Sequence, residues 1–214
     1  MIRELQDTAR EGASLLCQQA LAEAIVALAE DDHETALTRV SWAKERAPRS
    51  GVVREVLALA YYRSGDYRGA RAELDAAGRL GRSAKPSIAV RADVERGLGR
   101  PERAVEIYET ADLQTLDPEV RVELIVVAAS AFGDLGSPAA GVALLRRAVP
   151  WRGEGGEAQL RATYVEGTLA EAAGDLDGAR RAYARVATAD PVFSDVAERL
   201  SSLSSPRPRS PRNS

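Results

Sequence analysis

Hydrophobic residues recur along much of the chain at intervals of three and four positions, which places them on one face of an α-helix. One such segment covers residues 53–61 and another covers residues 70–77, with the polar sequence SGDYRG at 64–69 between them. Because glycine and aspartate interrupt the pattern, a tight turn is predicted there. This part of the chain is therefore predicted to form two amphipathic helices joined by a turn.

The same turn recurs at nearly constant spacing. It stands at 65–70 as GDYRGA, at 99–104 as GRPERA, at 136–141 as GSPAAG and at 174–179 as GDLDGA, and the sequence DDHETA at 31–36 precedes these four. The first positions of consecutive turns are 34, 34, 37 and 38 residues apart. Recurrence at such a period is the signature of a repeat architecture. We therefore expect five helix-turn-helix units.

The residues within these turns are suited to end one helix and begin the next. Four of the five turns open with glycine, which adopts the left-handed conformation at a helix C-terminus without strain. Asp66, Ser137 and Asp175 follow and are expected to cap the second helix through their side-chain oxygens. Pro101 and Pro138 fall at the first position of that helix, where a missing N–H costs nothing.

Small residues recur at fixed places in every unit, which predicts close crossings between helices. The positions seven residues before and five residues after the start of each turn are occupied by Ala24, Ala58, Ala92, Ala129, Gly167, Ala36, Ala70, Ala104, Gly141 and Ala179. A third set, seven residues further on, consists of Ala43, Ala77, Ala111, Ala148 and Val186. We expect all three sets to be buried.

This spacing resembles the tetratricopeptide repeat (TPR), a 34-residue helix-turn-helix unit with small residues at fixed positions and often a proline near its end. Pro48 and Pro191 match that last position. The stretch 52–136 also resembles a group of actinobacterial TPR-containing proteins that has no established activity. The resemblance to the TPR implies an all-α, superhelical solenoid of about five repeats at 17–50, 51–84, 85–121, 122–159 and 160–193.

The two ends of the chain differ from the repeats. Residues 1–16 are expected to form a helical cap or an extension of the first repeat, and residues 194–203 a C-terminal capping helix. Residues 204–214 contain three prolines, three arginines and no large apolar residue, so we expect a disordered tail. The glycine-containing segment 151–157 is expected to be an internal loop.

Composition excludes several classes of protein. The chain has a single cysteine and a single histidine, which rules out a disulfide scaffold and a metal cage built from these residue types. No stretch approaches the roughly 18 apolar residues of a membrane span, and the first residues lack the apolar run of a signal peptide. We therefore expect a cytoplasmic protein without a metal or cofactor.

Catalytic chemistry has few candidates. Cys17 has only His33 as a base, so we expect it to be a packing residue and not a nucleophile. His33 stands in a run of acidic residues at 30–34, which predicts a solvated acidic turn and not a general base or metal ligand. The sequence GEGGEA at 153–158 contains two glutamates that would repel a phosphate. We expect no enzyme.

Charge is unevenly distributed along the chain. Residues 49–100 contain eleven basic and six acidic residues, whereas the whole chain has a net charge of −3. One hypothesis is that this basic part of the second and third repeats, together with the arginine-containing tail, binds nucleic acid or an acidic partner. The other is that arginine serves this protein as its ordinary solubilising cation.

The TPR family lines a concave groove with the first helices of its repeats. The resemblance implies a partner-binding groove at the corresponding positions of this chain, which are Leu21, Ile25, Leu28, Glu55, Leu59, Tyr62, Arg63, Asp93, Arg96, Ser130, Tyr164, Thr168 and Glu171. TPR co-chaperones that grip a C-terminal carboxylate use lysine and asparagine at several of these places. This chain has Leu21, Ile25, Glu55 and Leu59 there instead, which disfavours such a clamp.

We therefore expect a non-catalytic adaptor or scaffold that binds a peptide or a helix in this groove. A purely structural, self-assembling scaffold is a further hypothesis, and the sequence does not indicate the partner. Aromatic and arginine side chains are the usual anchors of an interface. Truncation of Tyr62 or Tyr164 is accordingly expected to weaken partner binding while leaving the stability of the fold nearly unchanged.

Overall fold

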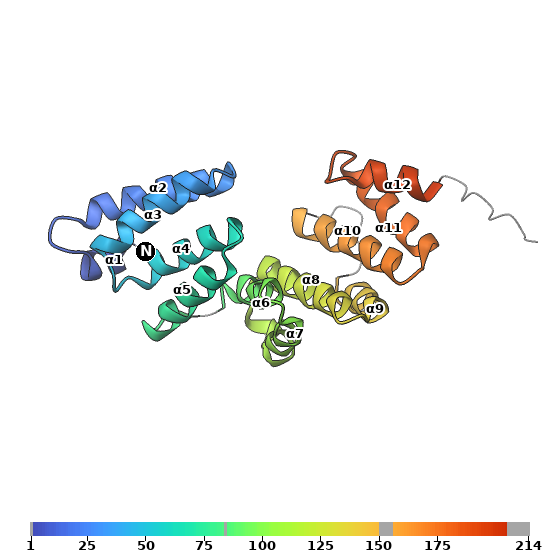
Figure 1. Cartoon of the computed structure of the whole chain (residues 1–214), viewed down its shortest axis with the longest axis horizontal. Coiled ribbons are helices and arrows are strands. Elements are labelled where there is room, and N and C mark those ends of the chain that lie inside the picture. The colour runs from blue at the N-terminus through green and yellow to red at the C-terminus, as the bar shows by residue number, and fades with distance from the viewer. Residues whose placement is uncertain (1, 84, 150–155, 205–214) are drawn as a thin grey trace, which may run out of the picture. The chain divides into compact units, whose positions relative to one another are not determined.

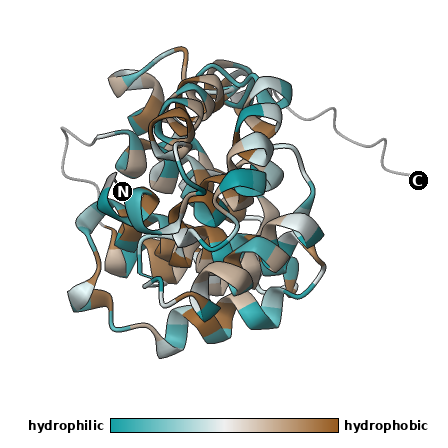
Figure 2. Ribbon diagram, turned by 90° about the vertical axis from the view of Figure 1, so that its left-hand side faces the viewer, coloured by the Kyte–Doolittle hydropathy of each residue, from teal (hydrophilic) through white to brown (hydrophobic). Residues whose placement is uncertain are grey.

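The computed structural model describes residues 2–83, 85–149 and 156–204, and over these residues the secondary structure is helical without any strand (Figure 1). The chain divides into two compact units, residues 1–120 and 121–214. Hydrophobic and hydrophilic positions alternate along the helices (Figure 2), as expected for helices that bury one face against a neighbour. The predicted all-α fold of helix-turn-helix pairs is confirmed.

Unit 1 consists of three helix pairs preceded by a short helix. Its elements are α1 (Ile2–Thr8), α2 (Ser14–Ala29), α3 (His33–Arg46), α4 (Gly51–Arg63), α5 (Tyr67–Arg79), α6 (Ile88–Gly97), α7 (Pro101–Thr110) and the short 3-10 helix η1 (Leu113–Thr115). Within each pair α2 packs on α3, α4 on α5 and α6 on α7. Successive pairs are joined by contacts of α3 with α4 and of α5 with α6, and α1 packs on α2.

Unit 2 continues the same pattern. It contains most of α8 (Pro118–Asp134), followed by α9 (Pro138–Ala148), α10 (Glu157–Ala172), α11 (Leu176–Ala189) and α12 (Val196–Ser204). Helix α10 packs on both α9 and α11, and α12 packs on α11. The final helix therefore covers the side of α11 that a further repeat would otherwise cover.

All five predicted turns lie between the helices of a pair. The first residue of each turn has a positive φ, which is 56° at Asp31, 80° at Gly65 and Gly174, and 74° at Gly99 and Gly136. Glycine adopts this left-handed conformation without the steric cost that other residues meet, so its place in four of the five turns is explained.

The predicted caps are correct in two of three cases. The carboxylates of Asp66 and Asp175 accept hydrogen bonds from the backbone N–H groups of Gly69 (2.9 Å) and Gly178 (2.8 Å). The prediction for Ser137 was wrong, because this residue precedes α9 but its side chain makes no capping hydrogen bond. The N–H of Ala140, which such a cap would accept from, donates instead to the backbone carbonyl of Ser137 at 3.0 Å.

The small residues before and after each turn are all buried, as predicted. A Cβ atom added at Gly141 would lie 2.5 Å from the carbonyl oxygen of Ala129, and one added at Gly167 would lie 2.6 Å from the ring of Tyr183. Backbones of neighbouring helices can therefore approach closely at these places. This explains the high alanine content of a chain with only 5% aromatic residues.

The third set of small residues is only partly buried. Ala43, Ala77 and Val186 are in the core, whereas Ala111 is half-buried and Ala148 is exposed. Helix α7 ends at Thr110, before Ala111, and α9 ends at Ala148 itself. These two second helices are therefore too short for the residue at this position to pack between helices. The prediction of burial was wrong at these two positions.

The ends of the chain contain helices outside the five pairs. A turn with Gly12 at φ 74° separates α1 from α2, and Leu5 of α1 is completely buried. Residues 205–214 of the predicted tail and residues 151–155 of the predicted internal loop lie outside the described residues. Over the described part of the chain, none of the helices combines the length and the apolar character that crossing a membrane requires.

Candidate functional site

The first helices of successive pairs lie next to one another. In unit 1, α2 contacts α4 and α4 contacts α6. In unit 2, a side chain of α8 pairs with one of α10, and α10 in turn is bonded to the residues that begin and form α12. We call the side chains that share this exposed side the first-helix face of each unit. The face of unit 1 comprises Ile25, Glu55, Leu59, Tyr62, Arg63, Asp93 and Arg96.

Two of the expected groove residues do not belong to any exposed face. Leu21 is fully buried and Leu28 is 6% exposed, and both are in the core cluster that also contains Leu5 of α1 and Val53 of α4. Neither side chain can contact a partner, so their assignment to the groove does not hold. Ile25, which lies between them in the sequence, is 46% exposed, so its side chain is accessible to a partner.

A polar triad joins α4 to α6 in unit 1. The hydroxyl of Tyr62 donates a hydrogen bond of 2.6 Å to Oδ2 of Asp93, and the guanidinium of Arg96 donates one of 2.5 Å to Oδ1 of the same carboxylate. The sequence placed all three residues in the groove, and the structure brings them into contact. Asp93 therefore links the two first helices.

Tyr62 is part of the scaffold as well as of its surface. Its ring packs against the core cluster of Ala58, Leu74 and neighbouring residues, and lies 6.2 Å from the ring of Tyr67. Burial and, secondly, the hydrogen bond to Asp93 raise the pKa of the Tyr62 hydroxyl well above its ordinary value. Truncation of Tyr62 would remove core packing, so the expectation that it leaves stability nearly unchanged does not agree with the structure.

The remaining residues of the face of unit 1 differ in their exposure. Leu59 is half-buried, and Glu55 accepts hydrogen bonds from the guanidinium of Arg82 at 2.9 and 2.5 Å. The side chain of Arg63 is 51% exposed, and its nearest carboxylate is that of Asp31 at 3.8 Å. Arg63 is thus the most accessible cation of this face.

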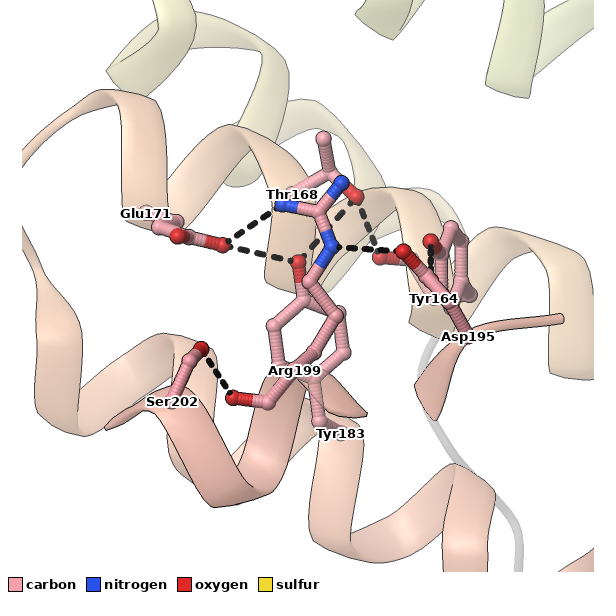
Figure 3. Close-up of polar contacts among 7 residues, drawn as sticks. All are labelled: Tyr164, Thr168, Glu171, Tyr183, Asp195, Arg199 and Ser202. Carbon is pink, nitrogen blue, oxygen red and sulfur yellow. Dashed lines mark hydrogen bonds and ion pairs between the residues drawn. The ribbon is translucent and has the colours of Figure 1, made fainter. Parts of the chain in front are cut away.

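A corresponding polar network forms in unit 2 around α12 (Figure 3). The hydroxyl of Tyr164 on α10 donates a short hydrogen bond to Asp195, and Nε of Arg199 lies 3.0 Å from the other oxygen of the same carboxylate. The Tyr164 hydrogen bond and then Arg199 lower the pKa of Asp195 below its ordinary value. The hydrogen bond to Asp195 in turn raises the pKa of Arg199.

The other expected groove residues of α10 belong to the same network. Glu171 accepts hydrogen bonds from Arg199 and from the hydroxyl of Tyr183, both at 3.2 Å, and the hydroxyl oxygens of Thr168 and Tyr183 lie 3.3 Å apart. Tyr183 on α11 is fully buried, and burial raises its pKa to about 12. Ser130 stands apart, since its hydroxyl donates to the carbonyl of Val126 on its own helix at 2.9 Å.

The two triads are equivalent. In both, a tyrosine on one first helix bonds an aspartate 31 residues later, and an arginine three or four residues further on pairs with that aspartate. Helix α12 thus stands where the first helix of a sixth repeat would stand. Sequence analysis missed Asp195 and Arg199 because it ended the repeats at residue 193. The signal that could have found them is the shared spacing of Tyr62 to Asp93 and of Tyr164 to Asp195.

Three buried glutamates between helices were also missed. Each is clamped by two cations from neighbouring elements: Glu73 by Lys44 and Arg54, Glu95 by Arg71 and Arg100, and Glu166 by Arg146 and Arg185. Glu166 lies in the lining of an open pocket of about 430 Å³ together with Arg146, Gly178, Arg181, Ala184 and Arg185. Two arginines of this pocket, Arg146 and Arg185, donate hydrogen bonds to Glu166 at 2.8 and 3.0 Å. Their charge is therefore paired within the protein.

Internal pairing also accounts for most of the basic segment 49–100. Seven of its eleven cations form ion pairs, namely Arg54 with Glu73, Arg63 with Asp31, Arg71 with Glu95, Arg82 with Glu55, Arg91 with Asp75, Arg96 with Asp93 and Arg100 with Glu95. A phosphate that bound here would therefore have to compete with carboxylates that already contact these guanidinium groups.

The two residues considered for catalysis are not arranged for it. Cys17 is fully buried, and burial raises the pKa of its thiol, which disfavours the nucleophilic thiolate. Beside His33, the carboxylate of Asp32 caps α3 through the N–H of Thr35, and Asp31 faces Arg63. Within the described residues, His, Cys, Asp and Glu side chains do not gather in groups of three or more that could hold a metal ion.

No protein-family model matches the chain, and no curated protein matches it. Among solved structures, the chain is similar to the TPR domain of P58(IPK), known from a crystal structure at 2.5 Å, with 13% sequence identity and a TM-score of 0.40. The match covers 89% of this chain and 65% of that chain. The resemblance to a group of actinobacterial TPR proteins stays a prediction.

Proposed function

We propose that the chain is a non-catalytic adaptor that binds a peptide or helix of a partner protein on the first-helix face of unit 1. The observation that carries the proposal is an accessible cation, Arg63, which directly follows Tyr62 of a fixed triad with Asp93 and Arg96. Ile25 on α2 adds an exposed apolar side chain. Side chains held by hydrogen bonds lose little conformational freedom when a ligand binds. Such preorganisation favours binding over chemistry, for which no nucleophile and base are paired on this face.

The exposed chemistry of the face suggests the kind of ligand. Ile25 offers apolar surface, and half-buried Leu59 offers more on the next helix. Arg63 makes only a long contact of 3.8 Å with Asp31, and exposed ion pairs of this kind contribute little stability. A ligand carboxylate could therefore replace Asp31 at small cost. We infer a segment with an aliphatic or aromatic side chain close to an aspartate or glutamate.

The corresponding face of unit 2 is less suited to a ligand. Tyr164, Thr168 and Glu171 are bonded to α11 or to residues of the α12 segment. A ligand there would have to displace Asp195 and Arg199 and break charge-assisted hydrogen bonds. These groove positions are accordingly proposed to stabilise the last repeat and not to form the primary binding surface.

A selection from a displayed library of random peptides tests the proposal without knowledge of the partner. Peptides selected on the full chain should contain a carboxylate near an apolar residue. Fluorescence anisotropy should show binding weakened about tenfold by Arg63→Glu and severalfold by Ile25→Ser. Arg68→Glu is the matched control, because Arg68 is exposed on α5, a second helix. Equal weakening by the control, or no selected peptide, would overturn the proposal.

The alternative hypothesis, binding of nucleic acid through the basic segment, makes a different prediction. Phosphate contacts release counterions, so the affinity for a DNA oligonucleotide would fall steeply between about 50 and 200 mM salt. The paired state of most of these arginines speaks against it. Salt-sensitive oligonucleotide binding that is lost in an Arg68→Glu variant would replace the adaptor proposal.

A further inference from the structure

Helix α2 exposes a row of uncharged residues on the side away from its own core. Leu15 is 73% exposed and Val26 is 55% exposed, although leucine and valine are usually buried in a folded domain. Gln19, Ala22 and Ala29 are exposed as well. We call these five residues the α2 seam.

The spacing of the α2 seam is that of a coiled coil. Its residues stand at positions 15, 19, 22, 26 and 29, an alternation of four- and three-residue steps that places all five on one line along a helix. The residues on the opposite side, including Cys17, Leu21 and Ala24, are the ones that build the core of unit 1. Helix α2 therefore has two apolar sides, and its own fold covers only one of them.

Within the described residues of unit 1, no polar element covers the α2 seam. Helices α1, α3 and α4 all contact α2 (Figure 1), yet the exposure of Leu15 and Val26 shows that none covers the seam. The terminal repeats of helical arrays need a polar outer face to remain separate in solution. Here the charge is confined to one residue of the helix, Glu23, which is paired with Arg39 at 3.0 Å.

The seam is complementary to a second copy of itself in the antiparallel direction. If Ala22 of one copy faces Ala22 of the other at a two-fold axis, the same register sets Leu15 opposite Ala29 and Gln19 beside Val26. At both ends of the seam the large side chain of Leu15 then meets the small one of Ala29, and the small side chains of the two Ala22 residues permit a close approach of the helices at the axis. Antiparallel pairing also places each helix C-terminus beside the N-terminus of the other, which is favourable for their dipoles.

We propose that the α2 seam is a homodimer interface in which two copies of α2 pair antiparallel about Ala22. The α2 seam shares no residue with the first-helix face of unit 1, although Ile25 of that face directly precedes Val26 of the seam. The seam spans fourteen residue steps, or about 21 Å of helix at 1.5 Å per residue. A standard stable interface buries about 800 Å² per partner, which is more than one helix of this length supplies. The dimer should therefore be weak, with a dissociation constant of roughly 10–500 µM.

Sedimentation equilibrium of the full chain at increasing concentrations, from about 5 µM to 1 mM, tests the proposal against that expected range of dissociation constants. We expect a monomer–dimer equilibrium that disappears in the double variant Leu15→Glu, Val26→Glu. Val192→Glu is the matched control, because Val192 is 84% exposed but lies in unit 2, and it should dimerise as the wild type does. Gln19→Leu should tighten the dimer by about tenfold, since it replaces the polar residue of the seam by an apolar one. A tighter but still discrete monomer–dimer equilibrium, with an unchanged circular dichroism spectrum, distinguishes this gain from aggregation of a misfolded chain.

Disulfide trapping tests the antiparallel register. Ala22→Cys should form a disulfide-linked dimer under mild oxidation, because the two sulfur atoms would meet at the axis. Leu15→Cys alone should not, since its two copies would be about 21 Å apart, whereas a mixture of Leu15→Cys and Ala29→Cys chains should cross-link. The native Cys17 is buried, so the wild-type chain serves as the background. A chain that stays monomeric at 1 mM, a dimer unaffected by Leu15→Glu, Val26→Glu, or efficient cross-linking of Leu15→Cys alone would overturn the proposal.

Discussion

The hydroxyl of Tyr62 donates a hydrogen bond of 2.6 Å to the carboxylate of Asp93, which lies 31 residues later on the first helix of the next pair. Tyr164 and Asp195 repeat this relationship at the same separation in unit 2. The bond of Tyr62 ties α4 to α6 and so fixes the spacing of the first-helix face of unit 1, on which a ligand is proposed to bind. The bond of Tyr164 ties α10 to the residue that precedes α12. The bonds are also charge-assisted, which makes them stronger than bonds between neutral groups.

Removal of the Tyr62 hydroxyl should therefore destabilise the fold. Tyr62→Phe keeps the packing of the ring but leaves Asp93 without one of its donors, so the free energy of unfolding should fall by about 1–2 kcal/mol. Urea denaturation measures this change. Tyr61→Phe is the control, because Tyr61 is half-buried on the same helix and no hydrogen bond of its hydroxyl is among those of the described residues. Equal midpoints for the two variants would show that the bond to Asp93 contributes nothing.

Two glycine-to-alanine substitutions should have opposite effects. In Gly141→Ala the new Cβ would lie 2.5 Å from the backbone oxygen of Ala129, so α8 and α9 must separate and the protein should lose about 2 kcal/mol or more. In Gly78→Ala the new Cβ meets nothing within 4 Å, and alanine favours the helix, so the protein should gain about 0.5–1 kcal/mol. Thermal unfolding followed by circular dichroism compares the two. A stable Gly141→Ala protein would contradict the close crossing.

The small residues of unit 1 allow a second packing test. Ala70 is fully buried where α4 meets α5, so Ala70→Leu should overpack this crossing and cost roughly 1–3 kcal/mol. Ala72 is exposed on the same helix, and Ala72→Leu should change the unfolding free energy by less than about 0.5 kcal/mol. Chemical denaturation of both variants measures the difference. Similar unfolding midpoints for the two would show that Ala70 does not lie at a close helix crossing.

Alkaline pH should unfold the protein through its buried tyrosines. The unfolded hydroxyl of Tyr183 ionises near its ordinary pKa of 10.0, whereas the folded one ionises only near 12. A raised folded pKa contributes stability that is complete below pH 10 and is lost as the pH rises toward 12. Tyr183→Phe should therefore flatten the fall in stability over this range. A fall of unchanged steepness in the variant would show that Tyr183 is not its source.

The sequence allowed the turns and the close crossings to be predicted because both depend on local chemistry. Gly65, Gly99, Gly136 and Gly174 are required by a left-handed backbone, and this requirement is visible as a periodic glycine. The small residues at the crossings are equally periodic. Ser137 does not cap α9 through its side chain, because the N–H of Ala140 donates to the backbone carbonyl of Ser137 instead.

The candidate site was less predictable because its residues depend on long-range contacts. Leu21 occupies a groove position of the family, but here it is in the same core cluster as Leu5 of α1, a helix that precedes the repeats. Likewise, the α12 segment supplies Asp195 and Arg199 to the face of unit 2 from beyond the last predicted repeat. A repeat template cannot indicate which groove positions are covered by elements outside the repeats.

The proposed ligand site on unit 1 is tested most directly by a charge swap at Arg63. The dissociation constant of a selected acidic peptide is measured for the wild type and for Arg63→Glu. The same two proteins are then measured with a peptide in which lysine replaces the acidic residue. We predict that Arg63→Glu weakens the acidic peptide by about tenfold or more and that the lysine peptide binds this variant better than the wild type. If both peptides lose affinity equally, or if neither responds to the substitution, Arg63 does not contact the ligand and the first-helix face of unit 1 is not the binding surface.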